Sequence, residues 1–556
     1  MILFRIILLQ IVCCANFNVF AQENPSQEYL ETKQDPYMPM LEHEKETSPS
    51  YFFSSPNIIT RQVNIDANGR NIVNDAANEP SIAIDPNNPS RMVIGWRQFD
   101  NILSNFRQAG IGISEDYGLH WKTLTPLQAG IFRSDPVLCA DNQGNFYYNS
   151  LAGDFNCYVH KTNQLQNWQQ QAYAHGGDKQ WMAVDNTGLN SDGNLYAYWN
   201  VDYSSCLDYN FTRSTDKGKV FESCSLIPSY LTRGTITVAV DGALYAAGSR
   251  FDNHYINRST NAANSTANPE WDFSTTVNMQ GELASYNGPN PVGLLGQVWI
   301  ASDHSQKASR GNLYLLSTVF RTDIGDLTDI MFSKSTDRGE NWSEPISINK
   351  DGITSNWQWF GTLSVAPNGR IDVVWMDTRD NPGTHLSCLY YSYSTDAGNH
   401  WSPDQKLSEA FDPHLGYPNQ GKIGDYIHMI SDDKGAHLAW TATFNGEQDV
   451  YYSYIKPDTI TTTSNPKDNQ VSLAIYPNPG SINSQFHFQS PKNQNIQLLI
   501  YNQLGIKIES QEFYIQSGNS KLELKNKIKE LIPGIYSIHV YNTKGILLAT
   551  KLFVVK

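Results

Sequence analysis

A repeated turn motif constrains the fold of this chain more than any other feature of its sequence. Four segments share the pattern Ser-x-Asp-x-Gly-x-x-aromatic, and two degraded copies, ending at Trp168 and Trp271, fall between them. The terminal aromatic residues stand at positions 121, 168, 221, 271, 342 and 401. A period of about 50 residues suits one four-stranded sheet per repeat, as in the blades of a β-propeller. The turn aspartates of the four complete copies are Asp116, Asp216, Asp337 and Asp396.

Each complete copy follows an alternating strand and precedes another, so the motif occupies a hairpin turn. The aspartate can accept hydrogen bonds from turn amides, and the glycine supplies a positive φ. These residues resemble the Asp-box, or BNR repeat, of sialidases and several other propellers. The resemblance implies a structural role for the four aspartates.

A second repeated feature, an apolar hairpin, gives another estimate of the number of blades. Seven occur, at residues 81–96, 136–149, 181–199, 236–248, 298–319, 363–375 and 427–440. After the seventh, residues 449–454 supply a third strand, and the missing fourth strand can come from residues 58–65. Such pairing would close the ring and remove its open edges. We therefore predict an all-β fold, a seven-bladed β-propeller, with six blades as the alternative, followed by a small β-sandwich.

The two ends of the chain predict an exported protein. Residues 1–21 have the layout of a signal peptide, with an apolar run too short to span a bilayer. We expect an N-terminal linker over residues 22–55, the propeller over 56–457 and a second linker over 458–470. No other stretch is long and apolar enough for a transmembrane helix.

The last 86 residues, 471–556, have a different character. Strands with a period of two alternate with polar turns, which predicts a small antiparallel sandwich. Tyr-Pro-Asn-Pro at 476–479, Pro-Gly-Ile-Tyr at 533–536 and the terminal Lys556 resemble the C-terminal sorting domain of type IX secretion. The resemblance implies export by that machinery and a secreted or cell-surface location. A plain carbohydrate-binding sandwich is the alternative.

Composition excludes some partners. The 40 Lys and Arg against 55 Asp and Glu give a net charge of −15, which argues against nucleic acid as a partner.

Cys206 and Cys224 lie on either side of one turn, and we expect a disulfide between them. The sequence has no phosphate-cradling loop or dinucleotide fingerprint, so no cofactor is predicted. No metal site is assigned, since the acidic loops match no known calcium loop.

Propeller geometry places ligands on the face opposite the repeated turns. Four arginines stand at the ends of second strands: Arg97, Arg250, Arg321 and Arg379. Guanidinium groups that converge there could bind the carboxylate of an acidic sugar, as the arginine triad of sialidases does. Alternatively, each arginine pairs with a nearby aspartate as a structural clamp.

The beginnings of first strands supply the candidate catalytic groups Asp135, Asp178 and Asp425. Sialidases use a tyrosine nucleophile, and Tyr426 is the best-placed tyrosine. Aspartates at strand starts also serve as turn caps. Trp357 and Trp359 could form a stacking floor for sugar rings, or lie buried between blades.

These features predict a secreted or surface-attached, sialidase-like exo-glycosidase that acts on terminal acidic sugars of extracellular glycans or glycoproteins. The Arg-Ile-Pro motif of sialidases is missing, so sialic-acid specificity has no support. Two alternatives stay open, a non-catalytic propeller that binds glycan or protein and a uronic-acid polysaccharide lyase. The glycosidase requires Arg97, Arg379 and a further arginine to converge beside Tyr426. The binding protein requires local carboxylates to neutralise these arginines.

Overall fold

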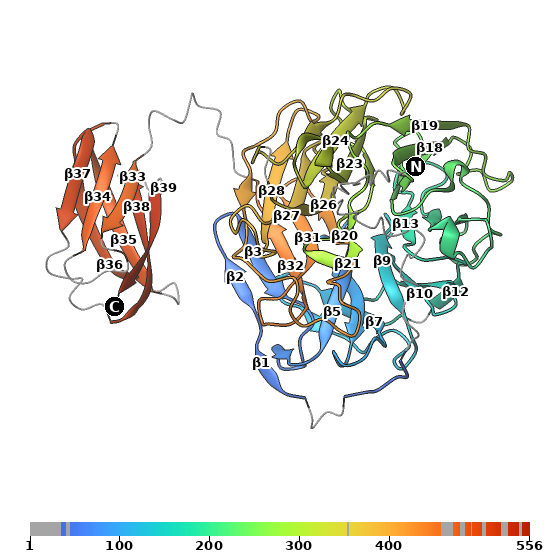
Figure 1. Ribbon diagram of the computed structural model, residues 1–556, viewed down its shortest axis with the longest axis horizontal. Helices are drawn as coiled ribbons and strands as arrows, with labels where there is room; N and C mark the ends of the chain where they lie inside the picture. The colour runs from blue at the N-terminus through green and yellow to red at the C-terminus, as the bar shows by residue number, and fades with distance from the viewer. Residues whose placement is uncertain are drawn as a thin grey trace, which may run out of the picture. The chain divides into compact units, whose positions relative to one another are not determined.

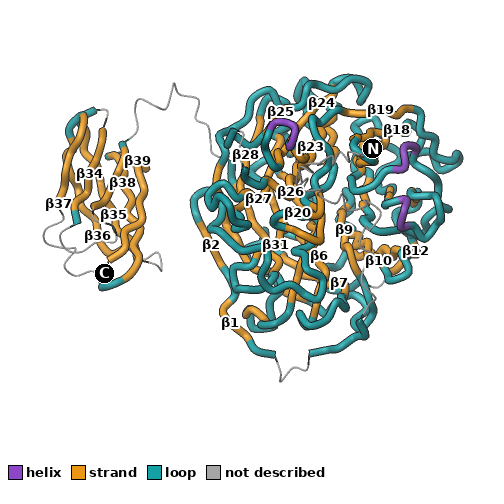
Figure 2. Tube along the Cα trace, viewed as in Figure 1, coloured by secondary structure: helices purple, strands orange, loops and turns teal. Residues whose placement is uncertain are grey.

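The computed structural model describes residues 35–40, 45–168, 170–352, 355–457, 471–476, 478, 484–490, 492–502, 507–523, 532–543 and 547–555. The predicted signal peptide and the linker at 458–470 lie outside these residues. The chain divides into two compact units, residues 1–458 and 459–556. Strands joined by loops dominate both units, and the helices are single 3₁₀ turns such as η2 (Val201–Tyr203), η3 (Pro228–Tyr230) and η4 (Thr322–Ile324) (Figure 2).

Seven antiparallel sheets of three to five strands make up the larger unit as described. Sheet 1 has β5 (Ala76–Ile84), β6 (Met92–Phe99), β7 (Gln108–Ser114) and β8 (Lys122–Thr123). Sheet 2 has β9 (Ser134–Ala140), β10 (Phe146–Leu151), β11 (Cys157–Thr162) and β12 (Gln170–Tyr173). Sheet 3 has β13 (Trp181–Val184), β14 (Leu195–Tyr198) and β15 (Phe211–Ser214). Sheet 4 has β16 (Ile236–Val238), β17 (Leu244–Arg250), β18 (Asn253–Ser259) and β19 (Phe273–Val277).

The remaining sheets continue in chain order. Sheet 5 has β22 (Trp299–Ser302), β23 (Leu313–Phe320), β24 (Thr328–Ser335) and β25 (Ile346–Ser347). Sheet 6 has β26 (Gln358–Val365), β27 (Ile371–Asp377), β28 (Cys388–Ser394) and β29 (Gln405–Lys406). Sheet 7 has β30 (His428–Ser431), β31 (Ala436–Ala442) and β32 (Asp449–Ile455), extended by β3 (Ile58–Gln62) and β2 (Phe52–Ser54). Two two-stranded sheets complete the described part of the unit, β1 (Thr47–Pro49) with β4 (Arg70–Ile72) and the hairpin of β20 (Ser285–Asn287) with β21 (Asn290–Leu294).

The sheets form a closed ring. The first strand of each sheet contacts the first strand of the next, from β5 through β9, β13, β16, β22 and β26 to β30, which contacts β5 again. Figure 1 shows the sheets following one another in chain order around the unit, from blue through green to orange. The larger unit is therefore a β-propeller-like, all-β fold.

The N-terminal strand closes this ring. β3 pairs antiparallel with β32, with Ile59 opposite Tyr454, so the predicted pairing of these two segments is confirmed. The strand ends at Gln62 instead of Ile65, and β2 adds a fifth strand from within the segment predicted as linker. Because β3 comes from the start of the chain and β32 from the end, the sheet ties distant segments together.

Aromatic side chains pack where first strands meet. Trp181 of β13 contacts Trp299 of β22 with ring centroids 4.9 Å apart. It also contacts Tyr426, just before β30, at 5.6 Å and His428 of β30 at 5.2 Å. All four rings come from first strands or their starts, in sheets 3, 5 and 7. Trp181, Trp299 and Tyr426 belong to the hydrophobic core that spans the ring.

The four Ser-x-Asp-x-Gly turns share one hydrogen-bond pattern. In each, the serine hydroxyl donates to the aspartate Oδ1 at 2.7 to 2.9 Å and accepts from the glycine N–H at 2.9 to 3.0 Å. The aspartate also accepts a backbone N–H from the next turn residues, as Asp396 does from His400. The turns therefore satisfy their own backbone donors, as the sequence predicts.

Replacing Asp396 with alanine should lower the free energy of unfolding by about 1 kcal/mol, because the Ser394 hydroxyl group and the backbone N–H and ring of His400 lose their partner at a half-exposed site. Urea unfolding followed by tryptophan fluorescence measures the change. Glu115→Ala, at the exposed second position of another such turn, is the control and should be neutral. An unchanged midpoint for Asp396→Ala would contradict a stabilising role for the motif.

The predicted disulfide between Cys206 and Cys224, in the larger unit, is confirmed.

The smaller unit contains two sheets. One has β33 (Ser472–Tyr476), β34 (Gln485–Ser490) and β37 (Gly518–Glu523), and the other has β36 (Lys507–Ile515), β35 (Gln494–Asn502), β38 (Gly534–Asn542) and β39 (Leu547–Val555). Apolar residues of both sheets, including Phe486, Leu498 and Phe553, share one core. This is the small sandwich that the alternating pattern predicts.

Candidate functional site

The starts of several first strands, together with the second strand β6, bring ionisable side chains together in the larger unit. Sheet 1 contributes Glu79 and Arg97, sheet 2 Asp135, the segment before β13 Asp178 and Lys179, and the segment before β30 Lys422 and Asp425. We call these seven residues the first-strand charge cluster. Four of them, Arg97, Asp135, Asp178 and Asp425, are residues that the sequence predicted for the site.

Ion pairs connect the cluster across four sheets. Arg97 Nη2 lies 3.2 Å from Glu79 Oε1, and Lys422 Nζ lies 3.6 Å from the same oxygen and 2.6 Å from Asp425 Oδ2. Lys179 pairs with Asp425 and lies 3.5 Å from Asp178 and 4.0 Å from Asp135. Each lysine therefore bridges carboxylates from different strands.

Backbone irregularities position two of these carboxylates. The pairing of β5 with β6 shifts register between Asn78 and Ser81, and that of β9 with β10 shifts between Asn149 and Leu151. Glu79 and Asp135 lie at these bulges with φ values of 50° and 48°. A bulge re-aims a side chain and is common beside functional sites. Positive φ at non-glycine residues is costly, so the surrounding contacts must hold it.

The buried carboxyl groups of the cluster differ in pKa because different charges surround them. Glu79 and Asp135 are fully buried, and Asp425 nearly so. Burial, together with the Asp135 and Asp425 carboxylates, raises the pKa of Glu79 to about 8, against the effect of Arg97. Burial alone would also raise the pKa of Asp135, but Lys179 and Arg97 outweigh it and hold that pKa at about 2. Lys179 and Lys422 likewise hold the pKa of Asp425 below its usual range.

A protonated carboxyl group beside ionised carboxylates is an arrangement used in acid–base chemistry. In this cluster, however, the groups are buried and pair with one another. Only Asp178 is partly exposed. The geometry therefore fits a clamp between sheets better than a site open to substrate.

The hairpin of β20 and β21 contacts the cluster from outside the seven sheets. Leu294 N–H donates to Asp425 Oδ1 at 2.9 Å, and the Asn290 side chain bonds the backbone of Ile423 and Gly424. In Figure 1 the two strands appear in the middle of the ring. The hairpin thus fixes the segment that carries Asp425.

Tyr426 does not face solvent. Its side chain is 3% exposed, and its hydroxyl group donates to the Pro136 carbonyl at 2.8 Å. Burial and the carboxylates of Glu79 and Asp135 raise its pKa well above the usual range. A nucleophilic tyrosine needs access to substrate and a lowered pKa, and the geometry of Tyr426 offers neither.

The four predicted arginines have separate partners. Arg97 pairs with Glu79, Arg250 with Asp202, and Arg321 with Asp329 at 3.0 Å. Arg379 binds Asp377 at 2.6 Å and Asp404 at 2.7 Å. Each arginine thus pairs with a nearby carboxylate, as the structural-clamp alternative requires, and their convergence on one substrate carboxylate stays a prediction.

The two predicted tryptophans also pack against protein. Trp359 is fully buried, and its Nε1–H donates to Ser387. Trp357 is partly buried and packs so tightly on Gly288 that any side chain at that position would meet its ring. Trp359 therefore has no exposed face for a sugar, and Trp357 supports the turn of the β20–β21 hairpin.

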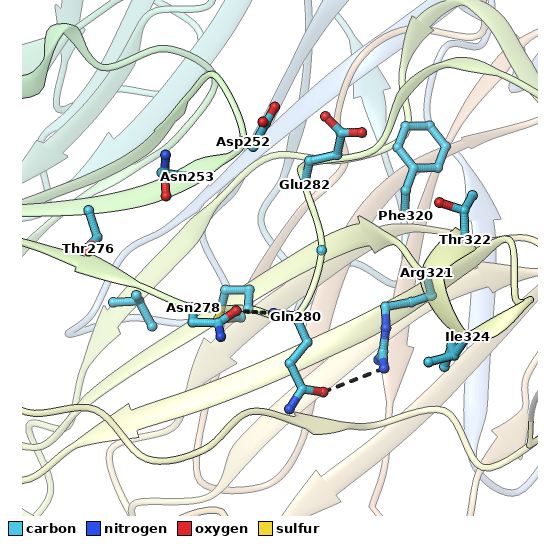
Figure 3. Close-up of a pocket in the computed structure, with 13 residues that line it drawn as sticks. Asp252, Asn253, Thr276, Asn278, Gln280, Glu282, Phe320, Arg321, Thr322 and Ile324 are labelled. Atoms are coloured by element: carbon cyan, nitrogen blue, oxygen red, sulfur yellow. Dashed lines mark hydrogen bonds between the residues drawn. The ribbon is translucent and has the colours of Figure 1, made fainter.

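A separate surface pocket lies between sheets 4 and 5, with a volume of about 690 Å³. Its polar lining includes Asp252, Glu282, Gln280 and Arg321, and its apolar lining includes Phe320. Figure 3 shows the carboxylates of Asp252 and Glu282 away from Arg321, whose guanidinium group donates a hydrogen bond to Gln280 Oε1 at 3.5 Å. Partial burial and the Asp252 carboxylate raise the pKa of Glu282.

Comparison with known proteins identifies the smaller unit. Residues 474–556 match the family of the secretion system C-terminal sorting domain. The predicted type IX sorting tail is therefore confirmed. It marks the protein for the type IX secretion machinery and for a secreted or cell-surface location. The described part of the chain contains no helix with the length and apolarity needed to cross a membrane.

Several solved structures resemble this chain at low sequence identity. No curated protein matches the chain. A protein of unknown function from Dyadobacter fermentans DSM 18053 is 12% identical over 72% of this chain and 100% of its own, with a TM-score of 0.41. Virginiamycin B lyase from Staphylococcus aureus is 11% identical over 72% and 99%, with a TM-score of 0.40. An α-L-arabinofuranosidase from Fusarium graminearum is 11% identical over 74% and 98%, with a TM-score of 0.27.

Sequence reasoning missed Glu79, Lys179 and Lys422. Glu79 and Lys179 stand at the starts of first strands, the same location that singled out Asp135 and Asp178, so the signal was present. Lys179 directly follows Asp178 in the chain. Lys422 carried no such signal, because it precedes its strand by several residues. The position of Lys422 in the cluster depends on the contact of the β20–β21 hairpin with residues 423–425.

Proposed function

We propose that this protein is an exported, seven-bladed propeller that binds extracellular glycans in the pocket between sheets 4 and 5. The seven sheets and their cyclic first-strand contacts support the blade count. The sorting tail supports an extracellular role. The pocket is the observation that carries the binding function, because it combines hydrogen-bonding side chains with an aromatic ring in a concave site.

The charges of the pocket favour a neutral or amino sugar. Asp252 and Glu282 would repel the carboxylate of an acidic sugar, and Asp329 already neutralises Arg321. Amide groups such as those of Asn278 and Gln280 suit hydroxyl groups, and Phe320 can pack against the apolar face of a sugar ring.

The sialidase-like hypothesis receives less support from the geometry. It requires guanidinium groups available to a substrate carboxylate, and the arginines in question bind local carboxylates. It also requires an accessible tyrosine, and Tyr426 is buried with its hydroxyl group bonded. These are the features that the sequence analysis assigned to a binding protein.

Replacing Glu282 with glutamine should weaken glycan binding about tenfold, because a charged hydrogen-bond acceptor in the pocket becomes neutral. A screen of neutral, amino and acidic glycans with the full chain identifies a ligand, and calorimetry then compares the variants. Glu115→Gln, on an exposed turn away from the pocket, is the matched control and should bind like the wild type.

Enzymatic assays also test this proposal, because it predicts that the protein has neither sialidase nor lyase activity. The purified protein should release no sialic acid from a fluorogenic sialoside and should not cleave uronic-acid polysaccharides. Turnover that Tyr426→Phe or Arg379→Ala abolishes would overturn the binding proposal in favour of an exo-glycosidase or lyase.

A further inference from the structure

We propose that the pocket between sheets 4 and 5 continues into a second subsite beside Trp342, so that the protein binds a linear oligosaccharide instead of a single sugar. This inference rests on the proposed glycan-binding function and adds the length of the ligand. The second subsite has a volume of about 240 Å³ and lies between the end of β19 and the segment of sheet 5 that leads into β25. We call the pocket described above the first subsite.

The two subsites share a wall. Thr276, Val277 and Asn278 line both of them, and Figure 3 shows Thr276 and Asn278 at the first subsite. Because the same three consecutive residues border both cavities, the cavities adjoin along the end of β19. A strand is extended, with a rise of about 3.3 Å per residue. The combined groove therefore suits an extended chain, such as a 1,4-linked oligosaccharide.

Trp342 supplies an aromatic surface in the second subsite. It is the terminal aromatic residue of the turn motif in sheet 5, and its Nε1–H donates to the Gly339 carbonyl at 3.1 Å. Trp121 and Phe221, at the same position of the first two complete turns, are buried, with exposed fractions of 8% and 6%. Trp342 packs against the core of sheets 4 and 5 but stays partly exposed. A partly exposed indole ring in a concave site can stack on a sugar ring.

Polar side chains surround this ring. Thr275 offers a hydroxyl group from β19, and Glu340 and Glu344 offer carboxylates from sheet 5. Glu344 is exposed, whereas Glu340 lies 3.9 Å from Arg258. These groups can bond the hydroxyl groups of a sugar, which both donate and accept hydrogen bonds. The carboxylates extend the preference of the first subsite for neutral or amino sugars along the whole groove.

Binding should therefore strengthen with the length of the glycan. An oligomer that fills both subsites makes the second set of contacts as part of the same binding event. Isothermal titration calorimetry of the full chain with 1,4-linked glucose and glucosamine oligomers, from one to six units, measures this dependence. In at least one series the hexamer should bind at least about tenfold more tightly than the monosaccharide.

Two variants test the second subsite. Trp342→Ala should weaken hexamer binding about tenfold and leave monosaccharide binding unchanged, because the first subsite keeps its lining. Glu344→Lys, at an exposed position, narrows the second subsite without touching the core and should also weaken hexamer binding. Trp401→Ala is the matched control. Trp401 ends the same motif in sheet 6 and packs on Phe332, so its loss should lower stability but not hexamer affinity.

The outcomes separate this inference from the proposed function. If the wild type binds hexamers no more tightly than monosaccharides, or if both Trp342→Ala and Glu344→Lys bind the hexamer as Trp401→Ala does, the second subsite does not exist. The first subsite then binds single sugars, and the proposed function stands. Failure of the wild type to bind any member of either series also overturns this inference, and the Glu282→Gln comparison then decides whether the first subsite binds a glycan at all.

Discussion

Replacing Arg97 with methionine should lower the free energy of unfolding by about 3–5 kcal/mol, the cost typical of breaking a buried ion pair. The Arg97 side chain is fully buried, donates to Asn78 and pairs with Glu79. It also helps to keep Asp135 and Asp425 ionised. Methionine keeps much of the volume but removes the charge, so the change isolates the electrostatic role.

Arg250→Met is the matched control, since that arginine pairs with Asp202 at a site open to solvent. Exposed pairs contribute about 0–1 kcal/mol, so the control should shift little. Urea unfolding at pH 9, above the pKa of Glu79 so that the Arg97–Glu79 pair is charged, is followed by circular dichroism and measures both. Equal small effects would show that the first-strand charge cluster does not hold the sheets together.

A double-mutant cycle adds a test of direct coupling. If Arg97 acts through Glu79, the variant that combines Glu79→Met with Arg97→Met should be more stable than the sum of the two single changes predicts. Additive changes would instead assign the effect of Arg97 to its other partners, Asn78 and Asp135.

Much of the fold follows from the sequence because its signals are local. Turn residues at fixed offsets and alternating apolar strands predicted the hairpins, and each of the four Ser-x-Asp-x-Gly turns has the expected hydrogen bonds. The closing pair β3–β32 could also be predicted, because a ring with one incomplete sheet requires a fourth strand from elsewhere. The β20–β21 hairpin was not predicted, since two short strands outside the repeat carry no periodic signal.

The candidate site was harder to predict, because position along a strand does not determine a side chain's partner. Arg97 and Arg379 stand at the ends of second strands in different sheets, and each pairs with local carboxylates. Arg97 pairs with Glu79, and Arg379 pairs with Asp377 and Asp404. The starts of first strands, in contrast, did gather Asp135, Asp178 and Asp425, because these starts meet around the ring. The burial of Asp425 involves its contact with the β20–β21 hairpin, and this contact depends on tertiary packing.

Between pH 5 and pH 8, the wild-type protein should lose stability relative to Glu79→Gln as the pH rises. The pKa of Glu79 is about 8 in the folded state, against 4.5 for an ordinary glutamate, so between these values the folded state holds a proton that the unfolded state has released. Its contribution is complete below pH 4.5 and is lost as the pH rises through 8. The slope should approach about 1.4 kcal/mol per pH unit.

The comparison with Glu79→Gln isolates this group from others that titrate. Asp135 and Asp425 have lowered pKa values, so their contributions are lost only as the pH falls below about 4. Buried His160, His254 and His428 have lowered pKa values too and act in the opposite direction, but equally in both proteins. Urea unfolding of both proteins at intervals between pH 5 and pH 8 gives the difference directly. Parallel curves would mean that Arg97 and Lys422 keep Glu79 ionised, and that the cluster consists entirely of charged pairs.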